Sequence, residues 1–392
     1  MKKIMIVASL LLTATMSFGD WGIPQNLGPG VNTSLFDYAP SLSVTQDTLY
    51  FTRLESNGED YTIYTSVFRG GAWDSAVSAG DSINTPDNGE GSAFISYDGR
   101  RLYFGRFPLN NHNDAHIYYS ERRNGVWQSP RRFEAAFNND PYSTYWPCFT
   151  HDGRRLYFYS FNRPGGRGNG DLWYSDYDTL TQTWGPPVNL GDSINTSDWD
   201  FCPTLSWDDR TLYFHSARAP TNKSKIYKSR MVNGVWQKWV VLPEPINWDL
   251  FMANSHYPCL SADGKHLLFG AEYIPFPNYG LFDVYDSQWV LGVELSRTYE
   301  RGGGLPKLAF PNPLTPGSRI LFMGSYFNRT TEVVLYDVRG KRMRSWSGPG
   351  FQSNGLFWDG QDGSGMILPS GVYFIELSTD GKRVLSKAVV LR

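Results

Sequence analysis

The 392-residue chain lacks the motifs that mark several common classes of functional site. It has three cysteines and six histidines, without the paired His/Cys spacing of zinc sites, so no metal site and no cofactor are expected. It contains no Gly-x-Ser-x-Gly elbow and no phosphate-binding glycine loop. Its formal net charge of −2 argues against a nucleic-acid partner or an anionic membrane.

Long apolar runs are also missing, except at the N-terminus. Met1–Gly19 begins with two lysines, continues with the apolar run Ile4–Leu12 and ends in Ser17-Phe18-Gly19, the pattern of a signal peptide cleaved after residue 19. No later run could span a bilayer, so no membrane span is expected after signal removal. The mature protein is therefore expected to be secreted or held at the cell surface.

Cysteine is too scarce to supply a disulfide framework. Cys148, Cys202 and Cys259 all lie at or beside the proline of one repeated phrase. An exported protein could form disulfides, but the odd number and the strand-interior positions favour buried free thiols.

Aromatic residues are abundant, at 16% of the chain, and they recur in a repeated hairpin. In Phe201–Ser216 a short apolar strand leads through Trp207-Asp208-Asp209-Arg210 into Leu212-Tyr213-Phe214. The phrase occurs four more times, three of them with an Asp-Gly turn, which suits tight hairpins. Its second strands begin at Leu49, Leu102, Leu156 and Leu267.

Each repeat continues with a third strand, a tight turn and a tryptophan that opens a fourth strand. These tryptophans are Trp73, Trp127, Trp184, Trp236 and Trp289, spaced 52 to 57 residues apart. Four antiparallel strands per unit are typical of a β-propeller blade, so residues 20–296 are predicted to form a five-bladed, all-β propeller. The extra segment Trp21–Leu27 resembles a fourth strand and could close the ring, and Trp289–Val293 competes for that place.

The repeated phrases, with their Pro-x-Leu-Ser, Asp-Gly, Leu-Tyr-Phe and Ile-Tyr segments, resemble the WD40-like, TolB-type propeller repeats of secreted bacterial proteins. The resemblance covers about residues 21–290. It implies the propeller architecture and says little about activity. That family often has six blades, whereas five complete copies occur here.

A different pattern follows the polar, glycine-rich linker 297–306. Residues 307–392 carry Phe310-Pro-Asn-Pro313, Val333–Gly340, Phe357–Gly363, Ser370–Leu377 and Lys387–Arg392 in order. This segment resembles the C-terminal sorting domain of type IX secretion cargo and the related FlgD-like immunoglobulin fold. The resemblance implies a small Ig-like β-sandwich that engages the secretion machinery.

Strand order predicts which face of the propeller carries function. In a four-stranded meander, the longer second-to-third links and the links between blades emerge on one face, here called the loop face. Carboxylates entering the innermost strands there are candidate catalytic groups: Asp37, Glu90 and Asp200. Candidate ligand-binding residues on the same face are Trp146, Tyr145, Arg53, Arg106, Arg163, Arg218, His256 and Glu272.

Three interpretations of these residues stay open. The arginines and carboxylates could pair with one another as scaffold, the aromatics could stack on sugar rings, or two carboxylates could hydrolyse a glycosidic bond. A hydrolase needs two carboxyl groups that are isolated from arginine, whereas a scaffold pairs them. We expect a binding or scaffold propeller for a carbohydrate or protein ligand, with a secreted glycoside hydrolase as the alternative.

Trp146 is expected to be either a channel plug or a ligand platform, with the platform favoured. A recurrent Asn, as in Asn84, is expected to close inter-blade turns rather than bind ligand.

Overall fold

The computed structural model describes residues 20–390 apart from 23, 59, 219–222, 244–245, 248–253, 273–278, 291–306, 311–313, 315, 324–329, 350–355 and 380–381. The predicted signal peptide and linker lie outside these residues. Among the described residues no helix could cross a membrane. The one helix named there is the short 3₁₀ turn η1 (Ala136–Asn138).

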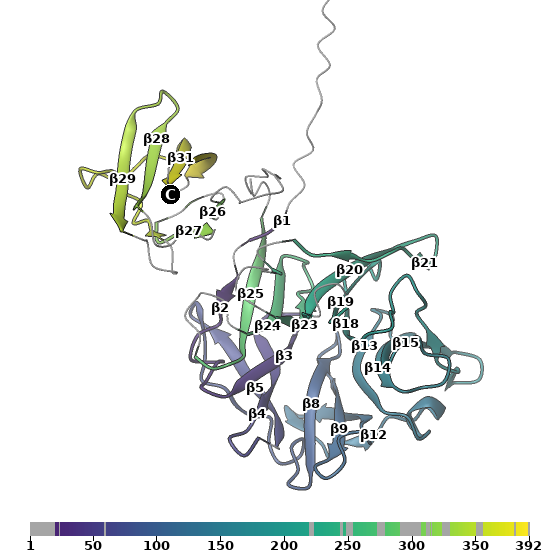
Figure 1. Ribbon diagram of the computed structural model, residues 1–392. Helices are drawn as coiled ribbons and strands as arrows, with labels where there is room; N and C mark the ends of the chain where they lie inside the picture. The colour runs from purple at the N-terminus through teal and green to yellow at the C-terminus, as the bar shows by residue number, and fades with distance from the viewer. Residues whose placement is uncertain are drawn as a thin grey trace, which may run out of the picture.

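Five antiparallel sheets form the blades of a propeller, which confirms the predicted fold class. Their inner strands contact one another in the cyclic order β3, β8, β13, β18, β23 and back to β3. Figure 1 shows these five strands around the centre of the ring.

Each blade has three long strands and an outer edge split into two dipeptide strands. Blade 1 holds β3 (Phe36–Leu42), β4 (Thr48–Leu54), β5 (Tyr61–Arg69), β6 (Ala72–Trp73) and β7 (Val77–Ser78). Blade 2 holds β8 (Asn88–Ile95), β9 (Arg101–Pro108), β10 (His116–Arg123), β11 (Val126–Trp127) and β12 (Arg131–Arg132). Blade 3 holds β13 (Thr144–Phe149), β14 (Arg155–Phe161), β15 (Gly170–Asp178), β16 (Thr183–Trp184) and β17 (Val188–Asn189). Blade 4 holds β18 (Asp200–Leu205), β19 (Thr211–Ser216), β20 (Lys225–Val232), β21 (Val235–Trp236) and β22 (Val240–Val241).

The fifth blade is closed by the N-terminal segment. Its own strands are β23 (Ser255–Leu260), β24 (His266–Ala271) and β25 (Asp283–Val290), and its edge is β1 (Asp20–Trp21) with β2 (Gln25–Asn26). Trp21 pairs with Trp289, which therefore belongs to the third strand of the blade. The prediction that Trp289 opens a fourth strand is wrong, because the N-terminal segment occupies that edge.

Apolar side chains fill the space between neighbouring blades. One cluster joins Tyr50 and Ile63 of blade 1 to Ala93, Leu102 and Phe104 of blade 2. Another packs the fully buried Trp21 against Tyr213, Phe269 and Tyr285, which ties the N-terminal strand to blades 4 and 5. All three cysteines are buried and free, as predicted.

The inner strand of every blade has a bulge at the same position. The pairing with the second strand shifts there in all five blades. The residue at the shift has a positive φ between 50° and 56° in each case. These residues are Ala39, Ser92, Trp146, Cys202 and Tyr257. Bulges of this kind bend a strand and re-aim its side chains, here around the propeller axis.

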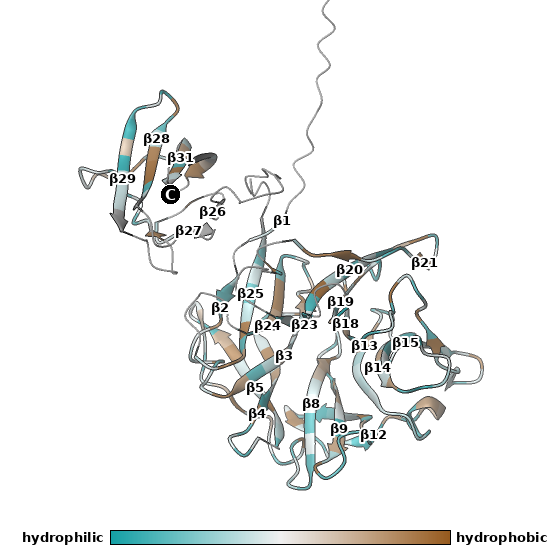
Figure 2. Cartoon of the chain, viewed as in Figure 1, coloured by the Kyte–Doolittle hydropathy of each residue, from teal (hydrophilic) through white to brown (hydrophobic). Residues whose placement is uncertain are grey.

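The C-terminal part contains two further sheets. One orders β26 (Lys307–Ala309), β27 (Arg319–Met323) and β30 (Leu356–Phe357), and the other orders β29 (Arg342–Pro349), β28 (Thr330–Asp337), β31 (Gly371–Thr379) and β32 (Lys382–Val390). A shared core that includes Ile320, Val333 and Trp358 makes them a small β-sandwich. Figure 2 shows a hydrophobic stretch in the central strand β28, where Val333, Val334 and Leu335 are buried, and a mainly hydrophilic edge strand β29.

Candidate functional site

The three candidate catalytic carboxylates each form a buried ion pair with a candidate arginine. Arg53 Nε lies 2.6 Å from Asp37 Oδ1, and Arg106 Nε lies 2.8 Å from Glu90 Oε1. Arg218 Nη2 pairs in the same way with Asp200. The arginine comes from the end of the second strand and the carboxylate from the start of the first strand of the same blade.

A threonine and a carbonyl complete this unit, which we call the Arg–carboxylate clamp. In blade 1 the Thr33 amide and hydroxyl donate to Asp37 at 2.7 and 2.9 Å, while Arg53 Nη2 donates to the Val31 carbonyl at 2.9 Å. Blades 2 and 4 repeat these bonds with Thr85 and Thr196. The clamp therefore ties the inter-blade loop to the inner and second strands.

Burial dominates the titration of the clamped carboxylates. It raises the pKa of Asp37 and Asp200 although the arginines pull it down. It raises the pKa of Glu90 to about 7. A tyrosine of the third strand lies beneath each guanidinium, with 4.2 Å from Arg53 to Tyr64 and 4.4 Å from Arg218 to Tyr227. Each clamp is thus enclosed on several sides.

Blades 3 and 5 depart from this pattern. In blade 3 the inner strand begins with Thr144, and Arg163 pairs instead with Asp140 of the inter-blade loop while donating to the Phe137 carbonyl at 2.9 Å. In blade 5 the carbonyl at the equivalent place, that of Ile246, accepts from the Ser255 hydroxyl at 2.7 Å.

Glu272 stands where the other blades have a clamp arginine. Its carboxylate accepts a 2.8 Å hydrogen bond from Asn254 Nδ2, and within the described chain it joins no ion pair. Burial raises the pKa of Tyr257, and the negative charge of Glu272 adds to that shift. Among the described residues, the fifth blade therefore offers a carboxylate without a cationic partner.

Aromatic rings close the propeller axis near the loop face. The residues one position before the bulge are Tyr38, Gly91, Tyr145, Phe201 and His256. A Cβ on Gly91 would lie 3.0 Å from the Tyr145 hydroxyl, and one on Gly105 would lie 1.7 Å from the Tyr145 ring, so two glycines make room for Tyr145. Tyr145 is therefore packed against blade 2, and its position is fixed.

Trp146 lies within this packing rather than at an open mouth. Its ring is 4.5 Å from that of Tyr145, 5.2 Å from Tyr159, 5.5 Å from Phe201 and 6.1 Å from Tyr257. The side chain is half-buried, so both the plug and the platform alternative stay open. Contact of Trp146 with a ligand stays a prediction.

His256 lies beside the aromatic layer. Its ring is 4.9 Å from His215 and 5.0 Å from Phe282, and burial lowers its pKa to about 4. His256 is thus neutral at physiological pH, and its Nε2 is buried without a hydrogen-bond partner in the described part of the chain.

The recurrent asparagine is structural in all five inter-blade connections. Asn84 accepts from the Ile63 amide at 3.0 Å and donates to the Ile63 carbonyl at 2.9 Å, so its side chain extends the ladder of the third strand. The same two bonds recur at Asn32, Asn138, Asn195 and Asn247. As the sequence suggested, the Asn lies in an inter-blade turn, where the Asn84 amide donates to the Gly80 carbonyl at 2.9 Å, and its side chain ties that turn to the third strand.

Two loop-face residues, Trp199 and Asp171, were not predicted from the sequence. Trp199 is 37% exposed and stacks 5.4 Å from both Phe161 and Phe201. Asp171 is buried, with Oδ1 unpartnered within the described residues, and burial raises its pKa. Trp199 could have been found as the aromatic that directly precedes Asp200.

Comparison with known proteins does not assign the chain to a family. No family model and no curated protein match it. Among solved structures, a candidate TolB protein from Agrobacterium tumefaciens is similar with 15% identity and a TM-score of 0.40, over 92% of this chain and 99% of that one. An α-L-arabinofuranosidase catalytic domain from Coprinopsis cinerea has 12% identity and a TM-score of 0.45, over 70% and 98%. An arabinanase from Bacillus subtilis has 13% identity and a TM-score of 0.44, over 67% and 97%. The assignment of five blades is based on the strand pairings described above.

In the part of the chain that the structure describes, the loop face thus combines three Arg–carboxylate clamps with a sector of blade 5 where Glu272 has no ion-pair partner. No group of three His, Cys, Asp or Glu side chains that could hold a metal occurs among the described residues. The arrangement in blade 5 can accept and donate hydrogen bonds through Glu272, Asn254 and His256 beside aromatic rings. These are groups that hold uncharged polar ligands.

Proposed function

We propose that this protein is a secreted or cell-surface binding propeller whose loop face holds a carbohydrate at the sector of blade 5. The observation that carries the proposal is the pairing of Asp37, Glu90 and Asp200 with arginines. A carboxylate enclosed in a clamp supports the fold and is poorly placed to attack or protonate a substrate. Because blade 5 has Glu272 in place of the clamp arginine, this carboxylate is available to a ligand.

Carbohydrate is the ligand class that this sector fits. Carboxylate and amide groups such as Glu272 and Asn254 hydrogen-bond hydroxyl groups, and the half-buried ring of Tyr257 offers apolar surface for a sugar face. Because His256 stays neutral, it can donate or accept a hydrogen bond without adding charge.

Glycan-array binding with a parallel hydrolysis screen tests the proposal. Glu272→Gln should weaken glycan binding at least tenfold, because the amide keeps the shape and loses the charge. Glu134→Gln, at an exposed loop position, is the matched control. Equal binding by wild type and Glu272→Gln would remove blade 5 from the site.

A glycoside hydrolase is the second candidate, and one observation favours it. A pKa of about 7 leaves Glu90 partly protonated near neutral pH, which a general acid requires. Turnover of aryl glycosides by wild type, with loss in Glu90→Gln, would support hydrolysis. Glycan binding without turnover would support the binding propeller.

We further propose that residues 307–392 direct export, on the strength of the sorting-domain motifs in their sequence. Their β-sandwich is compatible with an Ig-like domain of this type.

A further inference from the structure

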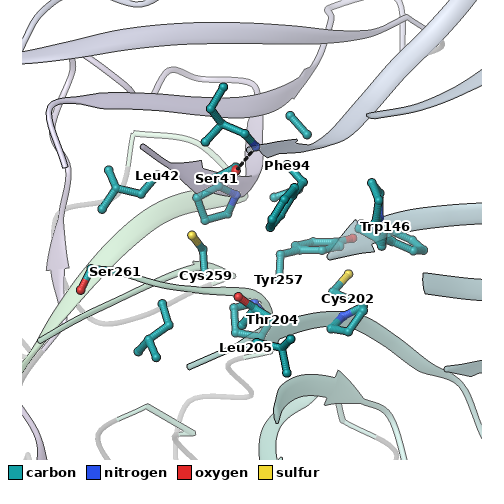
Figure 3. A pocket seen from close by; sticks show the side chains of 18 of the residues that line it. Ser41, Leu42, Phe94, Trp146, Cys202, Thr204, Leu205, Tyr257, Cys259 and Ser261 are labelled. Carbon is teal, nitrogen blue, oxygen red and sulfur yellow. Dashed lines mark hydrogen bonds between the residues drawn. The ribbon is translucent and has the colours of Figure 1, made fainter. Parts of the chain in front are cut away.

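The propeller axis contains a cavity that the loop-face site does not use. It has a volume of about 80 Å³ and lies in the half of the inner strands that leads to the hairpin turns. The five bulge residues line it, and so do the residues that follow them, four of which are prolines. Figure 3 shows Cys202, Cys259, Thr204 and Tyr257 around this space.

The aromatic layer separates this cavity from the loop face. Tyr38, Tyr145, Phe201 and His256 precede the bulges and do not line the cavity, whereas Trp146 and Tyr257 do. Tyr257 bridges the layer, with its ring 4.9 Å from Tyr38 and 6.1 Å from Trp146. Access is therefore from the hairpin-turn face.

One residue from each hairpin turn lines the turn-side end of the cavity. These five, which we call the mouth ring, are Val44, Tyr97, His151, Trp207 and Ala262. Blades 2 to 4 contribute aromatic rings, and blades 5 and 1 contribute small aliphatic side chains. The mouth ring is thus aromatic on one side and open on the other.

The aromatic side of the mouth ring is held in place. The Tyr97 ring stacks on His151 with 3.9 Å between centroids, and Trp207 meets both rings edge-on, at 3.5 Å from His151 and 5.7 Å from Tyr97. The Tyr97 hydroxyl donates to the Phe149 carbonyl at 3.1 Å. Trp207 remains 47% exposed, so the ring presents an aromatic surface to solvent.

The turns that carry the mouth ring are rigid. In four of them a Ser or Thr hydroxyl donates to the Asp two residues later at 2.6 to 2.8 Å. The same Asp accepts the backbone amide two residues further on at 3.0 to 3.1 Å. A ligand therefore meets a preorganised opening, which lowers the entropy cost of binding.

The cavity wall is uncharged, and it sets the hydroxyl groups of Ser41, Ser92, Thr204 and Ser261 among mostly apolar side chains. None of the side chains that line it is Lys, Arg, Asp or Glu. Burial raises the pKa of Cys259 to about 11 and that of Cys202 as well, so both thiols stay protonated. The wall accordingly suits an aliphatic group.

His151 provides the polar contact at the mouth. Both of its ring nitrogens are buried and lack a hydrogen-bond partner in the described part of the chain. Asp209 Oδ1 is 3.8 Å from Nδ1, beyond hydrogen-bond distance, and Asp209 instead accepts the His151 backbone amide at 3.1 Å. A neutral imidazole has one donor and one acceptor, and buried polar groups of this kind are normally satisfied.

We propose that this axial pocket binds a small uncharged molecule with a branched aliphatic body and one amide or hydroxyl group. The body fills the space beneath the mouth ring, and the polar group bonds His151. The volume sets the size, since a cavity of about 150 Å³ accommodates benzene and this one is roughly half as large. The inference does not depend on the loop-face proposal.

Isobutyramide is the probe, because it joins a branched aliphatic body to one amide. Titration followed by the indole and backbone N–H signals in ¹H–¹⁵N NMR should show saturable shifts in the wild-type chain. Ala262→Leu should reduce affinity at least tenfold by filling the open side of the mouth ring. Ala72→Leu makes the same change on the outer edge of blade 1 and should bind like wild type.

A second variant separates the polar contact from the apolar space. His151→Phe keeps a ring against Tyr97 and removes both nitrogens, so isobutyramide affinity should fall about tenfold. Xenon in pressurised crystals should still occupy the pocket of this variant and should be excluded by Ala262→Leu. Absence of saturable shifts in wild type, or unchanged binding by Ala262→Leu, would overturn the proposal. Unchanged isobutyramide affinity in His151→Phe would overturn the assignment of the polar contact.

Discussion

At the scale of single residues, the most constrained positions are the bulges of the inner strands. Trp146 and Tyr257 have φ values of 50° and 54°, a left-handed conformation that residues with a Cβ rarely adopt. Such strain costs of the order of 1–3 kcal/mol per residue and persists only where packing fixes the conformation. Here the rings around the axis supply that packing.

Trp146→Ala should therefore destabilise the propeller. The substitution removes a half-buried ring that contacts four other rings, and because truncation of a fully buried Trp costs about 3–5 kcal/mol, the loss should lie near or below the lower end of that range. Denaturant unfolding measures the loss. Trp207→Ala is the control, since its side chain is 47% exposed and should cost much less. A Trp146→Ala loss no larger than the control would favour the platform alternative.

Glu90 should make stability depend on pH in a defined window. Its ordinary pKa of 4.5 is raised by burial to about 7 in the folded chain, so the folded state binds the proton more tightly than the unfolded state. The resulting stability is present below pH 4.5, is lost between pH 4.5 and 7, and amounts to roughly 3 kcal/mol. In Glu90→Gln this component should vanish, so the stability difference between wild type and variant should shrink by that amount across the window. A constant difference would mean that Arg106 keeps Glu90 ionised throughout.

At the scale of elements, the hairpin and the blade could be predicted from the sequence because their signals are local. Apolar strands, Asp-Gly turns and aromatic second strands each act within a few residues. The bulges could not, because nothing in Trp146-Pro147 or Tyr257-Pro258 signals a positive φ. Trp289 has the spacing of a fourth strand, yet it pairs with Trp21, as Phe68 pairs with Trp73 in blade 1.

The candidate site shows the same division between local and long-range information. The residue types of the clamp were identifiable, since an Arg follows an Asp or Glu 16 to 18 residues later in the first, second and fourth copies. Which carboxylate each arginine meets depends on three-dimensional packing, so the pairing of Arg163 with Asp140 was not predictable. Asn138 also escaped the repeat pattern, because it ends a 3₁₀ turn instead of following an Ile.

Closure of the ring should depend on the N-terminal strand. Deleting residues 20–27 leaves β25 without its edge partners and exposes the apolar surface that the 1%-exposed Trp21 covers. The melting temperature of the whole propeller should fall, and Trp21→Ala alone should cost about 3–5 kcal/mol. Circular dichroism melts provide the measurement, with the partly exposed Trp289→Ala as control. Identical melting of full-length and shortened chains would show that β1 and β2 contribute little to closure.

At the scale of the whole molecule, some contacts that hold the blades together repeat around the ring, whereas the candidate binding residues differ from blade to blade. The Asn side chain of the inter-blade connection bonds the third strand in all five blades. By contrast, the clamp is altered in blade 3 and absent from blade 5, and the mouth ring is aromatic on one side only. Repetition identifies what holds the propeller together, and departures from it identify where a ligand can bind.

The C-terminal sandwich should be separable from the propeller and required for delivery. Its core draws its residues from 310–390, and none of these belongs to a propeller cluster. Removing residues 307–392 should therefore leave the propeller's thermal melt unchanged. In a host with type IX secretion, the same truncation should abolish surface delivery, while the signal peptide and tail fused to an unrelated soluble reporter should restore it. Delivery of the truncated chain would refute the sorting role. A lowered melting temperature would refute the independence of the two cores, so the two parts of the prediction fail separately.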